Sequence, residues 1–270
     1  MTGLLWDVLR MTAWEWEAPR PWGRFHTLFF CIGIPLAVLL ALGAARLGER
    51  ALRRVIFAVG VVLAVSEIYK QLFFVAAEGA YRFDQIPFQL CSVPMYLCLI
   101  LPWIDGRERF AAVSRAMWGF LASYGLMGGV ASYLSPETMC RPYVTLTVHS
   151  FVWHLCLIFL GVTAAAAGRT GRKMKDFGGA AAIYGICCCV AFAINLLCFN
   201  APGRDVNMFY LGPKPSYLVV CRDIVARFGW YVNLPVYTAA LTLGAGIIFF
   251  AVTVLPARIR RQRRERGTGK

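Results

Sequence analysis

A thiol and an amide stand near the start of one long apolar run in this sequence. Residues 86–103 read IPFQLCSVPMYLCLILPW, with Gln89 and Cys91 near the front. A cysteine with a histidine base is the minimum for nucleophilic acyl transfer. Two histidines, His149 and His154, lie in the later apolar stretch TVHSFVWHLC. We therefore take Cys91 as the candidate nucleophile and the two histidines as its candidate bases.

Cys91 also has a plain structural interpretation. Pro87 suits the first turn of a helix, so Cys91 would lie about one turn inside, where the helix end favours an anion. Cys91, Met95 and Cys98 share one helical face, however, which is also the pattern of a packing stripe. The chain has 10 cysteines, and within apolar runs a free cysteine behaves as a small apolar residue. The sequence leaves both interpretations of Cys91 open.

Another group of polar residues interrupts a second apolar run, in the stretch SEIYKQ. Glu67 and Lys70 are three positions apart, so on a helix they share a face and can form an ion pair. Gln71 extends the same polar stripe. Ionisable groups at membrane depth are costly and mark functional sites. The pair is either the wall of a site or a neutral structural bridge between helices, because a paired charge needs no other purpose.

The histidines have the same two interpretations. His26 opens the first apolar run in GRFHTLFF, and a buried histidine is either a hydrogen-bonded core residue or a proton carrier. His149 and His154 are separated by about 140° around a helix, so the two alone make a poor metal site. We predict neither a metal nor a cofactor. Cys140 and Cys221 fall in predicted loops, and the sequence does not say whether they pair.

The elements that must position these residues are membrane helices. The chain has 270 residues, of which 59% are hydrophobic and 16% charged, with a mean hydropathy of +0.60. Soluble domains carry more charge and fewer apolar residues. The predicted fold is all-α, a polytopic membrane protein built as one bundle of seven transmembrane helices. The predicted spans are residues 25–45, 53–76, 86–104, 111–134, 144–167, 177–199 and 231–255.

The basic residues predict the orientation of the bundle. Eighteen lysines and arginines fall in the connections and tail on one side, against nine on the other. Because positively charged loops stay in the cytoplasm, the protein is predicted to cross the cell membrane with its N-terminus outside and its C-terminus in the cytoplasm. Residues 1–24 are interpreted as an interfacial segment, 25–255 as the membrane domain and 256–270 as a basic cytoplasmic tail.

The net charge of +14 does not indicate a nucleic-acid partner. Much of this charge lies in the tail ARIRRQRRERGTGK, directly after a predicted span, and no folded soluble domain with a basic face is visible. Basic residues beside a span fit attraction to anionic lipid, so membrane lipids are the predicted partners. The oligomeric state is left open.

With this orientation, the unusual polar residues collect in the outer half of the bundle. They are His26, Glu67, Lys70, Cys91 and His149. Purely structural pairs should scatter over both halves, so this convergence predicts one cavity on the outer side. The long sixth connection, residues 200–230, carries Asn207 and Lys214 and is expected to lie over the mouth of the bundle as a lid.

Five motifs in this order resemble a known family: FHTLFF, EIYKQ, PFQLCS, HSFVWH and NMFYLGPKPS. The set looks like the bacterial YwaF-type integral membrane proteins, distantly related to animal transmembrane protein 164, over nearly the whole chain. The resemblance implies a seven-helix bundle and phospholipid acyl transfer through an acyl-cysteine, with Cys91 as the matching thiol. The animal proteins set a histidine beside their cysteine, whereas Ser92 follows Cys91 here, so the resemblance assigns no base.

The leading hypothesis is a lipid acyltransferase in which Cys91 attacks an acyl ester and His154 or His149 acts as the base. The residues predicted to shape the cavity or hold the substrate are His26, Glu67, Lys70, Gln71, Gln89, Asn207 and Lys214. The alternative is a transporter or small-ligand receptor that uses the same cavity without covalent chemistry. A third hypothesis is a structural membrane protein, in which the polar pairs only fix the helix register.

Overall fold

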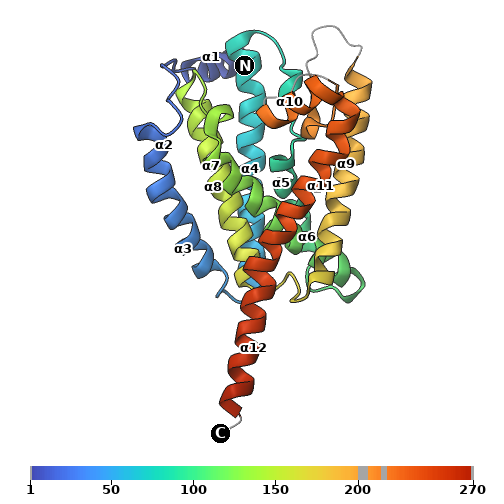
Figure 1. Cartoon of the computed structure of the whole chain (residues 1–270). Helices are drawn as coiled ribbons and strands as arrows, with labels where there is room; N and C mark the ends of the chain where they lie inside the picture. The colour runs from blue at the N-terminus through green and yellow to red at the C-terminus, as the bar shows by residue number, and fades with distance from the viewer. Residues whose placement is uncertain (1, 200–205, 214–217, 269–270) are drawn as a thin grey trace.

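The computed structural model describes residues 2–199, 206–213 and 218–268. Over these residues the chain is helical and contains no β-strand, apart from one isolated bridge between Glu15 and Tyr143. Figure 1 shows the long helices standing side by side as one upright bundle. The all-α prediction is confirmed. Lys214, a predicted substrate-binding residue, lies outside the described residues.

Several long helices in the described part contain a π-helical turn. They are α2–η1–α3 (Arg24–Leu28, Phe29–Gly33, Ile34–Ala44), α6–η5–α7 (Ala111–Phe120, Leu121–Gly125, Leu126–Leu134) and α11–η9–α12 (Trp230–Phe249, Phe250–Val254, Leu255–Thr268). The other long helices are α4 (Glu49–Glu78), α5 (Val93–Ile104), α8 (Val144–Ala166) and α9 (Phe177–Phe199).

Shorter elements join and cover these helices. Helices α1 (Thr2–Met11) and α10 (Val219–Phe228) lie at the end of the bundle that is uppermost in Figure 1. The 3-10 turns in the connections are η2 (Phe83–Gln85), η3 (Leu90–Ser92), η4 (Glu108–Phe110), η6 (Pro136–Thr138), η7 (Met174–Asp176) and η8 (Met208–Tyr210). At the opposite end, α12 extends below the bundle without a neighbouring helix (Figure 1).

Several helices are long and apolar enough to cross a membrane. Among the described residues, four segments meet both conditions: Arg24–Ala44, Val144–Ala166, Met174–Phe199 and Trp230–Arg266. The segment Leu90–Ile104 is apolar but shorter. Each of the seven predicted ranges contains a helix, although length and composition qualify only those four as candidate spans.

The third predicted span begins later than expected. Ile86 has an extended ψ of 134°, as the residue before a proline usually does. Helix α5 begins only at Val93, and Pro94 instead of Pro87 occupies its first turn. The prediction of a helix from residue 86 is therefore wrong at its start. Cys91 lies in turn η3, immediately before the helix, instead of one turn inside it.

Two glycines allow close approach of the helices that carry the predicted site residues. A Cβ added at Gly60 in α4 would lie 2.9 Å from the Cβ of Cys98 in α5. A Cβ added at Gly129 in α7 would lie 3.1 Å from the carbonyl oxygen of His154 in α8. Only glycine fits such contacts without a shift of the neighbour, so these two positions set the spacing of α4 against α5 and of α7 against α8.

Candidate functional site: a polar cavity beside the start of α5

A cavity of about 630 Å³ lies among α4, the start of α5, α7, α8, α11 and the turn η8. The predicted site residues that line it are Glu67, Lys70, Gln89, Cys91, His149, His154 and Asn207. The lining also includes apolar residues, among them Met127 and Ala131 of α7 and Leu241 of α11. The cavity therefore combines a polar side with a surface suited to hydrocarbon.

The ion pair predicted in α4 is present. The Nζ atom of Lys70 lies 2.9 Å from Oε1 of Glu67, and the side chain of Glu67 is only 6% exposed. The Nε2 atom of Gln71 donates to the same carboxylate oxygen at 2.6 Å and to the carbonyl of Gln85 at 2.7 Å. Gln71 itself is not among the lining residues, so its part is to hold the buried carboxylate and to tie α4 to turn η2.

Cys91 lies where α4, α8 and the start of α5 meet. The indole N–H of Trp153 in α8 donates to the Cys91 carbonyl at 3.0 Å. Lys70 and Glu67 are both close enough to act electrostatically on the thiol, in opposite directions, and Ser92 is hydrogen-bonded to it. In the described part of the chain, no hydrogen bond joins this thiol to either histidine of the cavity.

The two histidines of α8 both face the cavity, although they are on different sides of the helix. The Nδ1 atom of His154 lies 2.7 Å from the carbonyl oxygen of Ser150. A carbonyl oxygen only accepts, so Nδ1 carries the proton and Nε2 keeps its lone pair in the neutral ring. The His149 ring packs against the Trp153 ring in a tilted arrangement, with 5.5 Å between the ring centres. Its buried Nε2 has no hydrogen-bond partner among the described residues.

His26 lies apart from this cavity. Its Nδ1 accepts from the backbone N–H of Trp22 at 3.0 Å, so Nε2 donates to the carbonyl of Tyr133, also at 3.0 Å. The residue is fully buried and packs against Phe151, with 5.8 Å between the ring centres. Because both nitrogens are used by the backbone, His26 is a hydrogen-bonded core residue that fixes α2 against α7.

Gln89 holds a loop. Its Oε1 accepts from the backbone N–H of Phe209 at 2.9 Å, and its Nε2 donates to the carbonyl of Asn207 at 3.4 Å. On the other side, the Asn195 side chain in α9 accepts from the N–H of Met208 at 2.6 Å and donates to its carbonyl at 2.9 Å. Two side-chain amides, Gln89 just before turn η3 and Asn195 in α9, therefore hold the same short segment of the sixth connection.

This gripped segment is inserted into the bundle. Met208 and Phe209 are at most 1% exposed, and the Asn233 side chain in α11 donates to the Tyr210 carbonyl at 3.0 Å. Phe209 and Tyr210 have positive φ values of 54° and 56°, which bulky residues rarely adopt. Within the predicted lid, residues 206–213 thus form part of the cavity wall and Val219–Phe228 form α10, whereas residues 200–205 and 214–217 lie outside the described residues.

Sequence reasoning missed several residues of this site. Asn195 and Asn233 hold the inserted segment, and an amide inside an apolar helix was the signal that could have found them. Asp84 and Arg141 line the cavity from connections, where charged residues are ordinary and give no signal. These four residues show that the site is built as much by the connections as by the helices.

Asp84, one of the lining residues of the cavity, forms an ion pair with Arg82. The Nε and Nη2 atoms of Arg82 donate to its two oxygens at 2.8 and 2.9 Å, and Gln85 donates at 2.8 Å. Burial alone would raise the pKa of Asp84, but the hydrogen bonds from Arg82 and Gln85 outweigh it and the pKa is lowered. Asp84 is therefore an ionised and already paired carboxylate at neutral pH.

Among the described residues, no group of three or more His, Cys, Asp or Glu side chains is placed to hold a metal ion. Cys140 is a free thiol, so it forms no disulfide with Cys221.

These features define the class of the protein: an all-helical membrane protein with several apolar helices, built around a polar cavity. A model of the TMEM164 family matches residues 21–263. The chain belongs to the TMEM164 family. No curated protein and no solved structure matches the chain.

Proposed function

We propose that this protein is a membrane lipid acyltransferase with Cys91 as the nucleophile. One observation carries the proposal: Cys91, Lys70, His149 and His154, which come from three different elements, line a single cavity. The apolar side of that cavity suits an acyl chain. The resemblance to animal transmembrane protein 164, which is regarded as a phospholipid acyltransferase, points to the same reaction.

The reaction is a transfer in two steps. The Cys91 thiol gives its proton to Nε2 of His154, and its sulfur attacks the carbonyl carbon of an acyl ester in a phospholipid. The ester C–O bond then breaks, the departing lysophospholipid oxygen takes the proton from His154, and the acyl group remains on sulfur as a thioester. In the second step the hydroxyl of another lipid attacks the thioester, and its proton returns to the sulfur through the same imidazole.

The surrounding groups have distinct roles in this scheme. The charge of Lys70 favours the thiolate, against the opposing charge of Glu67, and favours the oxyanion that forms on the attacked carbonyl. The Glu67 carboxylate holds Lys70 in place through the ion pair, and Gln71 donates a hydrogen bond to the same carboxylate. Catalytic hydrogen bonds are often long before substrate binds and shorten in the complex. The bound ester therefore brings the Cys91 thiol and His154 together, with His149 as the other candidate base.

Acyl exchange in vesicles tests this function. Purified protein is mixed with a phospholipid carrying a labelled acyl chain and an unlabelled lysophospholipid, and the labelled product is measured. Cys91→Ala is expected to abolish exchange, because no other group forms the thioester. Cys98→Ala is the matched control, since Cys98 is fully buried in α5, and it should retain exchange. Exchange by Cys91→Ala at the rate of the unmodified protein would overturn the proposal.

A second function is favoured by the lack of a hydrogen bond between the Cys91 thiol and an imidazole among the described residues. A transporter or small-ligand receptor would use the same cavity without covalent chemistry. In that case Cys91→Ala keeps ligand binding, whereas Glu67→Gln or Lys70→Met abolishes it. Binding of a labelled lysophospholipid by the Cys91→Ala variant, with no exchange product from the unmodified protein, would select this function.

The proposal extends to the topology. Seven helical segments cross the cell membrane, with the N-terminus outside and the C-terminus in the cytoplasm, and membrane lipids, not nucleic acids, are the partners. Support comes from a helix in each of the seven apolar ranges and from the excess of eighteen basic residues on one side over nine on the other. Within its family, the chain is assigned to the bacterial YwaF-type branch on the five ordered motifs.

A further inference from the structure

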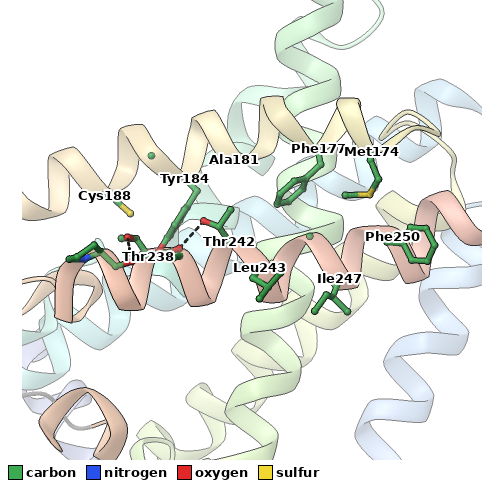
Figure 2. Close-up of a pocket in the computed structure, with 14 residues that line it drawn as sticks. Met174, Phe177, Ala181, Tyr184, Cys188, Thr238, Thr242, Leu243, Ile247 and Phe250 are labelled. Atoms are coloured by element: carbon green, nitrogen blue, oxygen red, sulfur yellow. Dashed lines mark hydrogen bonds between the residues drawn. The ribbon is translucent and has the colours of Figure 1, made fainter. Parts of the chain in front are cut away.

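A second hollow, of about 1060 Å³, lies on the other side of α11. It is a groove between α9 and α11, and Figure 2 shows its side chains arranged along these two helices. Tyr237 and Leu241 of α11 line the polar cavity, whereas Thr238, Ala239 and Thr242 line the groove. Helix α11 therefore separates two hollows of different chemistry.

The groove presents a hydrocarbon surface. Leu243 and Ile247 at its side are 67% and 60% exposed. Thr238 and Thr242 donate their hydroxyl protons to carbonyl oxygens one turn earlier in the same helix, at 2.8 Å each, so these hydroxyls are already occupied. The residues whose small size makes the hollow are Ala181, Gly185, Ala239 and Gly246. Such a surface suits an aliphatic chain lying lengthwise.

One end of the groove is basic. Met174 and Phe250 lie at this end (Figure 2). The guanidinium carbon of Arg258 in α12 lies 5.6 Å from the ring centre of Phe250, and the exposed Lys175 follows Met174 in the chain. Helix α12 carries six arginines in total. A cation is therefore held where the apolar surface ends.

We infer that this groove binds an anionic phospholipid, with an acyl chain along α9 and α11 and the phosphate on Arg258. Basic pockets between membrane helices recognise anionic headgroups in this way. A second copy of the chain suits the groove less well, because pairing through α11 would bring two six-arginine helices close together. The inference is independent of acyl transfer, since none of the proposed catalytic residues lines the groove.

Thermal unfolding of the full-length protein in a neutral detergent tests the headgroup. Phosphatidylglycerol should raise the unfolding midpoint by several degrees, because a ligand that binds only the folded state stabilises it. Phosphatidylcholine with the same chains should raise it much less. Arg258→Gln is expected to remove the difference between the two lipids. Arg263→Gln, at an exposed position of the same helix, should preserve it.

Filling the groove tests where the chain lies. A Cβ added at Gly185 meets open space, so Gly185→Leu places a side chain in the groove without a backbone clash. Gly178 in the same helix is equally unobstructed but lies outside the groove, so Gly178→Leu is the matched control. Gly185→Leu should raise by about tenfold the phosphatidylglycerol concentration that gives half of the full rise in unfolding midpoint. Gly178→Leu should leave that concentration unchanged.

Three results would overturn the inference. The first is equal stabilisation by the two lipids, and the second is an unchanged response in Gly185→Leu. The third is a chemically cross-linked dimer that forms in the unmodified protein and is lost in Gly185→Leu, because it would make a second copy of the chain the occupant of the groove.

Discussion

Gln89 explains, at the scale of single residues, why an apolar segment opens with polar side chains. It accepts from the Phe209 N–H and donates to the Asn207 carbonyl. Phe209 and Tyr210 have positive φ, a conformation that costs on the order of 1–3 kcal/mol for each bulky residue. The surrounding amides hold the loop in this conformation. Gln89 therefore builds the cavity wall, while Cys91, two positions later, is the group proposed to react.

Replacing Gln89 tests this role directly. Gln89→Met removes both hydrogen bonds at similar side-chain length and leaves the Phe209 N–H unpaired in the bundle. We expect a loss of about 1–3 kcal/mol in the free energy of unfolding, seen as a lower midpoint of thermal unfolding in detergent. Gln262→Met, at an exposed position in α12, should change stability by less than about 0.5 kcal/mol. Equal midpoints for the two variants would show that Gln89 does not hold the loop.

The site residues differ in how far the sequence could predict them. The Glu67–Lys70 pair follows from the helical period alone, because its partners are three positions apart and meet at 2.9 Å. The partners of Gln89 are 118 and 120 positions away, so no local pattern reveals them. For the same reason, the sequence alone could not show that Trp153 donates to the Cys91 carbonyl. Nor could it show that no hydrogen bond within the described part of the chain joins an imidazole to the Cys91 thiol.

At the scale of elements, hydropathy predicted the helices because a chain in lipid must satisfy its backbone polar groups within each segment. A helix lies in every predicted range. The irregular parts were not predictable in this way. The late start of α5 follows from Pro87 and Pro94, and the inserted segment 206–213 depends on amides from α9 and α11. Both features decide where the cavity lies.

The contact of α4 with α5 gives a prediction at this scale. In Gly60→Leu, the new Cβ would lie 2.9 Å from the Cβ of Cys98 and 3.1 Å from its backbone, so the two helices must separate. We expect a loss of about 1–3 kcal/mol in stability and reduced acyl exchange, because Glu67 and Lys70 are carried by the same helix. Unfolding in detergent and the vesicle assay measure the two effects.

Gly43→Leu in α3 is the control for that substitution. A Cβ at Gly43 meets nothing within 4 Å, so this variant should keep the unfolding midpoint and the exchange rate of the unmodified protein. If Gly60→Leu matched Gly43→Leu in both measurements, the close approach of α4 and α5 would not be what positions the ion pair.

At the scale of the whole molecule, the distribution of charge supports the proposed orientation. The basic residues are concentrated on one side, eighteen against nine, and the tail helix α12 extends from the bundle at one end (Figure 1). A reporter that works only in the cytoplasm should be active when fused after residue 270 and inactive when fused before residue 1. Activity at both ends would contradict an odd number of spans.

The central claim is that Cys91 carries the acyl group during transfer. The most direct measurement is peptide mass spectrometry of the full-length protein, quenched in acid after incubation with a phospholipid of defined acyl chains. We predict a mass increase equal to one acyl group on the peptide that contains Cys91, released by neutral hydroxylamine as a thioester is and absent from Cys91→Ala. Lipid exchange that proceeds with Cys91 unmodified, or in the Cys91→Ala variant, would contradict the claim.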